Sequence, residues 1–247
     1  MIQSDDNTDS APQQQVLPRT PATFALLGAI VLVYVISLVL SGGIFQPTLG
    51  VLVLLGAKVN SMIAGGAYWR LLTATFLHAS LIHIFFNGYA LYALGPETER
   101  IYETRRFLAL YFLAGLSGSL ASYLMSSAVS VGASGAIFGL IGGLGVFYYL
   151  NRATLGDFGK AQVQNMISIA MINLFIGFAS QGTIDNWGHL GGLVGGVLAG
   201  LALAPRIQID TRFVPPLLRR EYPALGWAGA AALLGMIAAM ALLLPPA

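Results

Sequence analysis

The chain has 247 residues, of which 56% are hydrophobic and only 9% are charged. Soluble domains carry about 25% charged residues, so this composition excludes a water-facing globular surface and makes the lipid bilayer the expected surroundings. The net charge of +2 is too small to indicate a nucleic-acid partner, and the lack of cysteine excludes disulfides, thiolate catalysis and cysteine-ligated metal sites.

The first 21 residues are polar and include Asp5, Asp6 and Asp9. They lack the basic start and the small-residue cleavage site of a signal peptide. We expect residues 1–21 to form a disordered cytoplasmic tail, so that the first apolar segment is a retained membrane helix.

Apolar segments recur along the rest of the chain. A transmembrane helix needs about 20 mostly apolar residues. Seven stretches meet this requirement, namely 22–41, 77–95, 106–125, 133–150, 162–180, 187–204 and 225–244. The apolar piece 44–57 is shorter and contains Pro47, so we place it as an interfacial or re-entrant segment in a long first loop, 42–76.

These spans predict an all-α fold, a polytopic membrane helical bundle without internal repeats. We expect a six-helix core over residues 22–204, a basic cytoplasmic linker over 205–224 and an additional C-terminal transmembrane helix within 225–247. With the N-terminus in the cytoplasm, the inside segments hold ten Lys and Arg residues and the outside segments hold two, Lys58 and Arg70. This positive-inside bias predicts a cytoplasmic N-terminus and an outside C-terminus.

All three histidines, His78, His83 and His189, lie within or at the edges of predicted spans. Ionisable groups in a membrane are costly and are functional candidates. His83 and Asn87 are four residues apart and share a helix face. They are either interhelical hydrogen-bond donors that stabilise the bundle or part of a catalytic site, whereas the position of His78 favours a structural role.

The fourth span opens with Gly132-Ala-Ser134-Gly135. Taken alone, a G-x-S-G sequence in a glycine-rich chain indicates a serine packed between small residues. At the first turn of a helix, however, free backbone N–H groups lie beside such a serine and can bind a developing oxyanion.

The sixth span opens with a histidine, His189, and carries glycine at every fourth position. Taken alone, the histidine could anchor a helix end at the membrane interface. The repeating glycines form a small face that allows close approach to another helix, and the fourth span offers a similar face. The two faces are Gly188, Gly192, Gly196 and Gly200, and Gly135, Gly139 and Gly143.

The polar residues of spans two, four and six agree in depth. These spans run in the same direction, and each carries its polar residue early, at the outer side. A serine beside a histidine forms an activated nucleophile, in which the imidazole takes the hydroxyl proton and returns it to the leaving amine. Asp185, four residues before His189, could orient the histidine, but we favour a solvated loop position for it and therefore expect a Ser134–His189 dyad rather than a triad.

The chain lacks the residues that metalloproteases and aspartate proteases require. The chain has no H-E-x-x-H helix and no carboxylate central in a span, so a zinc site and a paired aspartate site are excluded. We expect neither a metal nor a cofactor.

Three motifs together resemble the rhomboid intramembrane serine proteases: H-x-x-x-N at His83, G-x-S-G at Ser134 and G-H-x-x-G at His189. Trp69-Arg70 also resembles the loop motif of that family. The resemblance covers about residues 60–204 and implies a rhomboid-like six-helix core with one extra helix, as in the six-plus-one members.

The resemblance also implies a role for each site residue. Ser134 would be the nucleophile and His189 the general base. An oxyanion hole would consist of His83, Asn87 and the Ser134 backbone N–H. Gly132 would leave backbone room beside it.

Phe138, one turn from the serine, would pack against the histidine ring. The substrates implied are single-span membrane proteins, cut near the outer face. A loop at 181–186 would cap the site, and the fifth span would border the access route. We expect a multi-pass protein of the bacterial inner membrane.

Two alternative functions remain open. A transporter or channel would also explain intramembrane histidines, although it predicts polar groups throughout the membrane depth. A non-catalytic scaffold that binds membrane helices would not need Ser134 or His189. The sequence predicts no oligomeric state.

Overall fold

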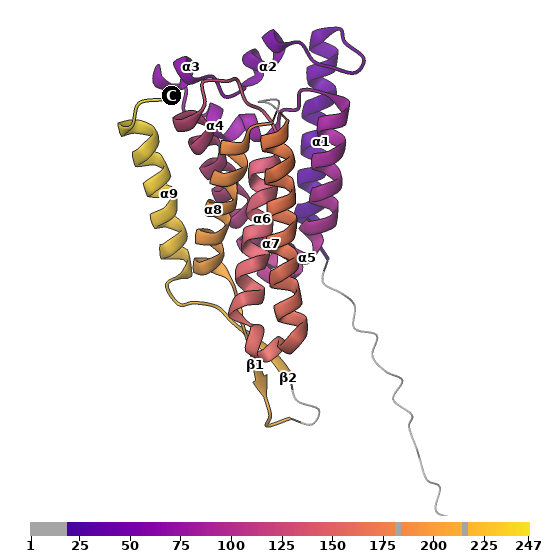
Figure 1. Ribbon diagram of the computed structural model, residues 1–247, viewed down its shortest axis with the longest axis vertical. Helices are drawn as coiled ribbons and strands as arrows, with labels where there is room; N and C mark the ends of the chain where they lie inside the picture. Colours follow the sequence, from indigo (N-terminus) through magenta and orange to yellow (C-terminus); the bar gives the residue numbers. More distant parts are fainter. Residues whose placement is uncertain (1–18, 181–183, 214–216) are drawn as a thin grey trace, which may run out of the picture.

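The structure, a computed structural model, describes residues 19–180, 184–213 and 217–247. Most of the expected tail, residues 1–18, lies outside this part. The elements in chain order are α1 (Pro21–Ser41), α2 (Leu49–Leu55), α3 (Asn60–Ala64), α4 (Arg70–Thr73), a 3₁₀ helix (Ala74–Phe76), α5 (Leu81–Met125), α6 (Ser134–Leu150), α7 (Arg152–Ala179), α8 (Asn186–Leu203), β1 (Arg206–Asp210), β2 (Leu217–Glu221) and α9 (Gly226–Leu243). The long helices stand side by side, with α2 and α3 at the upper end and the β-hairpin at the lower end of Figure 1. We call these the α3 end and the hairpin end.

Helix α5 consists of two antiparallel halves. Glu103 has φ 64° and ψ 154°, which interrupts the helix. The start of α5 is tied to the α3 end, because the Leu81 N–H donates to the Phe45 carbonyl at 3.1 Å. The other end returns there, since the Asn60 amide donates to the Tyr123 carbonyl at 3.1 Å. The chain therefore reverses direction at Glu103.

All seven predicted spans correspond to helical segments: α1, the two halves of α5, and α6 to α9. Within the described residues, four helices, α1, α5, α7 and α9, are long and apolar enough to cross a membrane, and α6 is a shorter apolar helix of 17 residues. The predicted polytopic helical bundle is confirmed. Two boundaries differ from those expected. Span two was expected to begin at residue 77, and the helix begins at Leu81, after a cap by Ser80. Span five was expected to begin at residue 162, and α7 begins at Arg152, with an interruption at Gly156.

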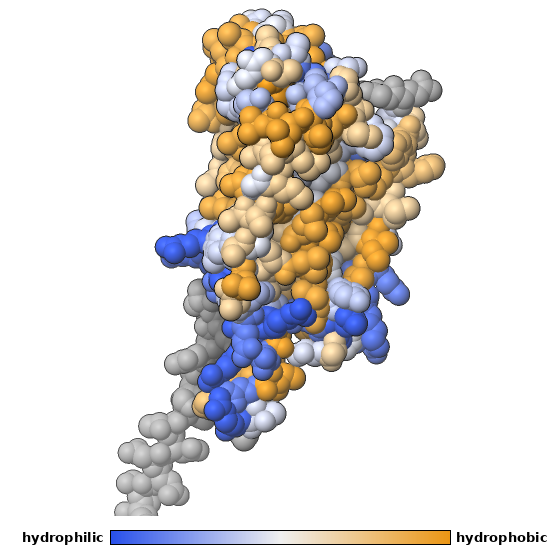
Figure 2. Space-filling view, turned by 90° about the vertical axis from the view of Figure 1, so that its left-hand side faces the viewer, coloured by the Kyte–Doolittle hydropathy of each residue, from blue (hydrophilic) through white to orange (hydrophobic). Residues whose placement is uncertain are grey.

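The outer surface of the bundle is apolar. Figure 2 shows hydrophobic residues over the body of the molecule, whereas hydrophilic residues gather toward the hairpin end. Large apolar side chains such as Val39, Phe175 and Leu243 are 74%, 75% and 80% exposed. Such a surface is unfavourable in water and matches the hydrocarbon core of a bilayer.

Glycines allow close contact at the centre of the bundle, where α5, α6 and α8 pack against one another. A Cβ atom on Gly192 would collide with the Gly135 carbonyl, and one on Gly196 would collide with the backbone of Gly139. The predicted contact between the two glycine faces is therefore confirmed. It brings the beginnings of α6 and α8 together at the α3 end.

The first loop is held by a buried arginine. Residues 44–57, predicted as an interfacial segment, include α2. The Arg70 guanidinium donates through Nη1 to the Val53 carbonyl at 2.7 Å and to the Ala57 carbonyl at 3.0 Å. This arginine fixes the end of α2 against α4.

At the hairpin end, a carboxylate caps a neighbouring helix. Glu99 of α5 is 2% exposed and accepts the backbone N–H groups of Ala22 and Thr23 at 3.0 and 2.8 Å. It also accepts the hydroxyls of Thr23 and Thr104 at 2.8 and 2.9 Å. A carboxylate at a helix N-terminus satisfies free donors and interacts favourably with the helix dipole, so Glu99 fixes α1 to α5.

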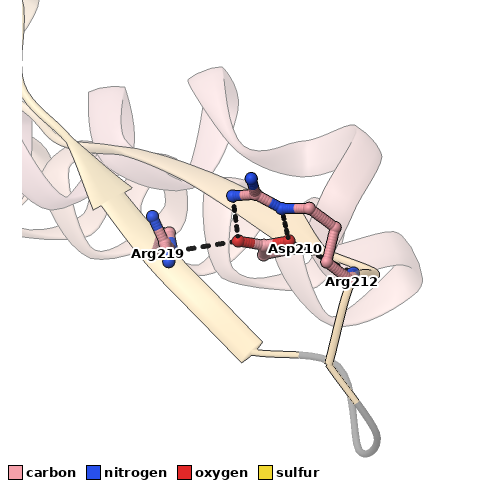
Figure 3. Close-up of polar contacts among 3 residues, drawn as sticks. All are labelled: Asp210, Arg212 and Arg219. Carbon is pink, nitrogen blue, oxygen red and sulfur yellow. Dashed lines mark hydrogen bonds and ion pairs between the residues drawn. The ribbon is translucent and has the colours of Figure 1, made fainter.

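The basic linker contains structure that was not predicted. Strands β1 and β2 form an antiparallel hairpin in which Arg206 lies opposite Glu221. Figure 3 shows Asp210 held by Arg212, at 2.9 and 2.8 Å, and by Arg219, at 3.1 Å. The hydrogen bonds from Arg212 lower the pKa of the Asp210 carboxyl below its usual value.

Candidate active site

Ser134 is the first residue of α6, as predicted. The preceding Gly132 has φ +132°, a conformation that side-chain-bearing residues rarely adopt, and its N–H donates to the Ala74 carbonyl at 2.9 Å. The Ile137 N–H donates to the Ala133 carbonyl and begins the helical hydrogen bonding. The N–H of Ser134 precedes that bond and belongs to the free donors of a helix start.

His189 lies in the first turn of α8 and is 8% exposed. Its ring stacks on Phe138 of α6, with centroids 4.3 Å apart and planes inclined by 17°. The imidazole Nδ1 has no hydrogen-bond partner within the part of the chain that the structure describes. Phe138 therefore orients the ring by packing, while no third side chain among those described bonds to Nδ1.

The backbones carrying Ser134 and His189 are adjacent. A Cβ atom on Gly135 would lie 3.2 Å from the Gly188 carbonyl oxygen. Since Gly135 follows Ser134 and Gly188 precedes His189, the first turns of α6 and α8 are in direct contact. The structure thus brings the two expected dyad residues to one place.

His83 lies against the loop that precedes Ser134. A Cβ atom on Gly132 would be 2.7 Å from His83 Nε2 and 3.8 Å from Ser134 Oγ. At the other side of the ring, Nδ1 accepts the Ala79 N–H at 3.5 Å. A neutral ring that accepts at Nδ1 carries its proton on Nε2, so the donor faces the space between Gly132 and Ser134.

Asn87 lies one turn after His83 and is 6% exposed. Its amide donates to the His83 carbonyl at 3.0 Å, within the same helix. The structure therefore shows this amide on its own helix and not on Ser134. A primary amide has a second N–H, which this bond leaves for another acceptor.

His78 is fully buried but precedes α5 instead of lying within it. Its Nδ1 is 3.3 Å from the Phe76 carbonyl oxygen, and its ring centroid is 5.1 Å from that of His83. These contacts agree with a structural role, in which His78 supports the His83 ring.

A small polar cavity lies beside Ser134. Its volume is about 20 Å³, which is enough for one water molecule. The residues that line it include Thr75, Ser119, Ser130 and Asp185. Water can therefore be held within the bundle next to the serine.

Asp185 was expected to be solvated, and this expectation was wrong. The residue is partly buried, its Oδ1 accepts the Gly188 N–H at 2.9 Å, and its Oδ2 accepts the Ser130 hydroxyl at 2.5 Å. An aspartate immediately before a helix is a common N-cap, so the sequence carried a signal for the first contact. Nothing in the sequence indicated the second one. The remainder of the expected capping loop, residues 181–183, lies outside the described residues.

Comparison with known proteins identifies the family of this chain. Residues 65–206 match the model of the Rhomboid domain. The chain belongs to the rhomboid family. It is similar to the Rhomboid protease GluP of Bacillus subtilis, with 47% identity over 152 residues, and to Rhomboid-like protease 3 of Toxoplasma gondii, with 37% identity over 169 residues.

A plant relative, RHOMBOID-like protein 5 of Arabidopsis thaliana, is 34% identical over 176 residues. The three matches cover 62%, 68% and 69% of this chain, in the order bacterial, parasite and plant. They cover only 29%, 63% and 56% of those relatives, so the similarity concerns the rhomboid domain and not their whole length.

Proposed function

We propose that this rhomboid protein is an intramembrane serine endopeptidase, which hydrolyses peptide bonds in or near transmembrane segments of other membrane proteins. The observation that carries the proposal is the contact between the first turns of α6 and α8, with the His189 ring stacked on Phe138. It supports a working dyad, because a serine and a histidine are brought together at one end of a membrane bundle.

In the proposed reaction, His189 accepts the Ser134 hydroxyl proton while Oγ attacks the substrate carbonyl carbon. The negative charge that develops on the carbonyl oxygen is stabilised by the Ser134 N–H, the His83 Nε2–H and the Asn87 amide. The protonated His189 then gives its proton to the leaving amine, and the C–N bond breaks. Water, held in the cavity beside Ser134, hydrolyses the resulting ester by the same route.

Substrates reach the site from the bilayer in this proposal. Helix α7 is mostly exposed, and only Gly159, Met166, Ala170 and Gly177 of it are buried. A helix held by few contacts supports an access route beside it. A substrate carbonyl within a helix is already hydrogen-bonded, so cleavage is expected where the substrate helix is weak.

A transporter is the second candidate, and the distribution of polar groups disfavours it. The three histidines lie at the α3 end. His78 contacts His83, His83 lies against Gly132, and Gly135 contacts Gly188, the residue before His189. A transport path requires polar groups through the membrane depth.

The orientation follows from the same positive-inside bias. We place the N-terminus in the cytoplasm and the α3 end at the outer face of a bacterial inner membrane. A reporter fused after Arg106 is then expected to read cytoplasmic and one at the C-terminus to read outside. The opposite pattern would place the site at the cytoplasmic face.

The decisive test is cleavage of a type I membrane substrate by detergent-purified protein. Ser134→Ala and His189→Ala should each abolish cleavage, whereas Ser61→Ala, at an exposed position of α3, serves as the matched control and should cleave normally. Fluorophosphonate labelling requires the serine that His189 activates, so it should be lost in Ser134→Ala and in His189→Ala and retained in Ser61→Ala. Substantial cleavage by either dyad variant, with contaminating proteases excluded, would refute the proposed function.

A further inference from the structure

One carboxylate connects the two segments that carry the proposed dyad. Asp185 precedes α8, and its Oδ1 caps that helix by accepting the Gly188 N–H at 2.9 Å. Its Oδ2 accepts the hydroxyl of Ser130 at 2.5 Å, across 55 residues of sequence. Ser130 lies four residues before Ser134, and Gly188 lies one residue before His189. Each oxygen of Asp185 is therefore bonded to a different one of the two segments.

Lys58 holds the segment that carries Ser130. The backbone of Ser130 pairs with that of Lys58, with N–H to carbonyl distances of 3.0 and 3.2 Å. The Lys58 side chain is 1% exposed and donates through Nζ to the carbonyls of Ser126 and Ala128 at 2.6 and 2.8 Å. These bonds from Lys58 hold the segment before Ser134 independently of α8.

Both bonds of Asp185 belong to a strong class. Hydrogen bonds to an ionised carboxylate are shorter and about twice as strong as neutral ones. A carboxylate at the start of α8 also interacts favourably with the helix dipole. These contacts hold the beginning of α8 in a fixed place relative to the segment that leads into α6.

We propose that Asp185 and Ser130 form a clasp that sets the position of His189 relative to Ser134. The inference rests on the proposed protease function and deepens it. Asp185 is a positioning residue in this assignment, because it acts through α8 and does not touch the reacting atoms. The cavity that Asp185 and Ser130 line beside Ser134 places the clasp at the site.

The simpler role for Asp185 is that of a helix cap that only stabilises α8. Asp185→Ser separates the two roles, because a serine still caps a helix but has one oxygen and cannot also accept from Ser130. Ser130→Ala removes the other partner without touching α8. Ser130→Thr retains a hydroxyl and is the conservative control.

The experiment measures kcat, KM and melting temperature for these variants and for the Asp185→Ser/Ser130→Ala double variant, in one detergent and with one membrane substrate. A misplacement of about 1 Å can cost roughly 10²-fold in rate, so we expect kcat to fall about 10- to 100-fold in each single variant. KM and melting temperature should change little. The double variant should be no slower than the slower single variant, since both remove the same bond, and Ser130→Thr should retain kcat.

The outcomes separate the two proposals. If the unchanged protein does not cleave, or if Ser134→Ala still cleaves, the protease proposal fails. If the unchanged protein cleaves and Ser134→Ala does not, normal kcat in Ser130→Ala would overturn the clasp. Strictly additive losses in the double variant would overturn it as well. Should Asp185→Ser fold poorly, the Ser130→Ala and Ser130→Thr pair decides the question alone.

Discussion

The Phe138 ring lies nearly parallel to the His189 ring, with 4.3 Å between centroids. Phe138 is one turn after Ser134 on α6, so one helix carries both the proposed nucleophile and the surface that orients the proposed base. Because the described residues provide no partner for His189 Nδ1, this flat contact and the fixed start of α8 hold the ring.

The stacking gives the first prediction. Phe138→Tyr keeps the flat ring and should retain cleavage, whereas Phe138→Ala removes it and should lower kcat. An aromatic pair contributes about 0.5–1.5 kcal/mol beyond burial, which corresponds to roughly a 2- to 13-fold change. The turnover of both variants, compared at equal amounts of folded protein, checks this. Equal turnover in Phe138→Ala and the unchanged protein would show that packing does not orient His189.

The second prediction concerns the oxyanion donors. His83→Ala or Asn87→Ala should lower kcat by about 10²–10³-fold with KM nearly unchanged, because the charge they stabilise appears only in the transition state. As bundle-stabilising donors, their loss should instead reduce stability by roughly 0.6–2 kcal/mol each. Turnover and melting temperature are measured on the same preparation. A large melting shift with intact turnover would assign both residues to structure.

The glycine contact between α6 and α8 gives the third prediction. Gly192→Leu should separate the two helices, because even a Cβ atom there would collide with the Gly135 carbonyl. Cleavage should fall by more than the amount of membrane-inserted protein. Gly235→Leu is the matched control, since nothing lies within 4 Å of a Cβ at that position. Normal cleavage by Gly192→Leu would mean that this contact does not set the dyad distance.

The fourth prediction concerns stability at the hairpin end. Glu99→Gln keeps the shape of the side chain but removes the charge that accepts the α1 donors. Hydrogen bonds to charged groups contribute about 1.5–3 kcal/mol, so we expect a loss of about 1–3 kcal/mol in the free energy of unfolding. Denaturation in detergent measures it, with the exposed Glu221→Gln as the control. Equal losses in both variants would contradict the role of Glu99 as a cap.

Lys58 gives a prediction for pH dependence. Burial lowers the pKa of Lys58 to about 8 from 10.5, although the charge of Asp185 partly opposes this change. The unfolded chain therefore binds more protons between these values, and the Lys58 contribution to stability should rise from pH 8 to pH 10.5. Melting temperatures over this range, compared with Lys58→Met, isolate the effect. A pH dependence that is the same in Lys58→Met would rule out Lys58 as its source.

Much of the fold could be predicted from the sequence, because apolar length and Lys/Arg placement depend on local composition. The proposed site residues could also be selected, since polar groups in apolar spans are few. The turn at Glu103 could not be predicted, because a positive φ on a glutamate has no sequence signature. The bond between Ser130 and Asp185 depends on tertiary packing across 55 residues, and the β1–β2 hairpin lies in a polar linker without the alternation of a buried strand.

The cap on α1 also imposes an order of events on biosynthesis. Glu99 follows Thr23 by 76 residues, so the start of α1 leaves the ribosome well before its acceptor does. Until the first half of α5 has been made, the donors of Ala22 and Thr23 must bind water or lipid headgroups. The capping of α1 is thus a non-local step, and a nascent chain halted before Glu99 should hold a first helix that is inserted but not yet capped by α5.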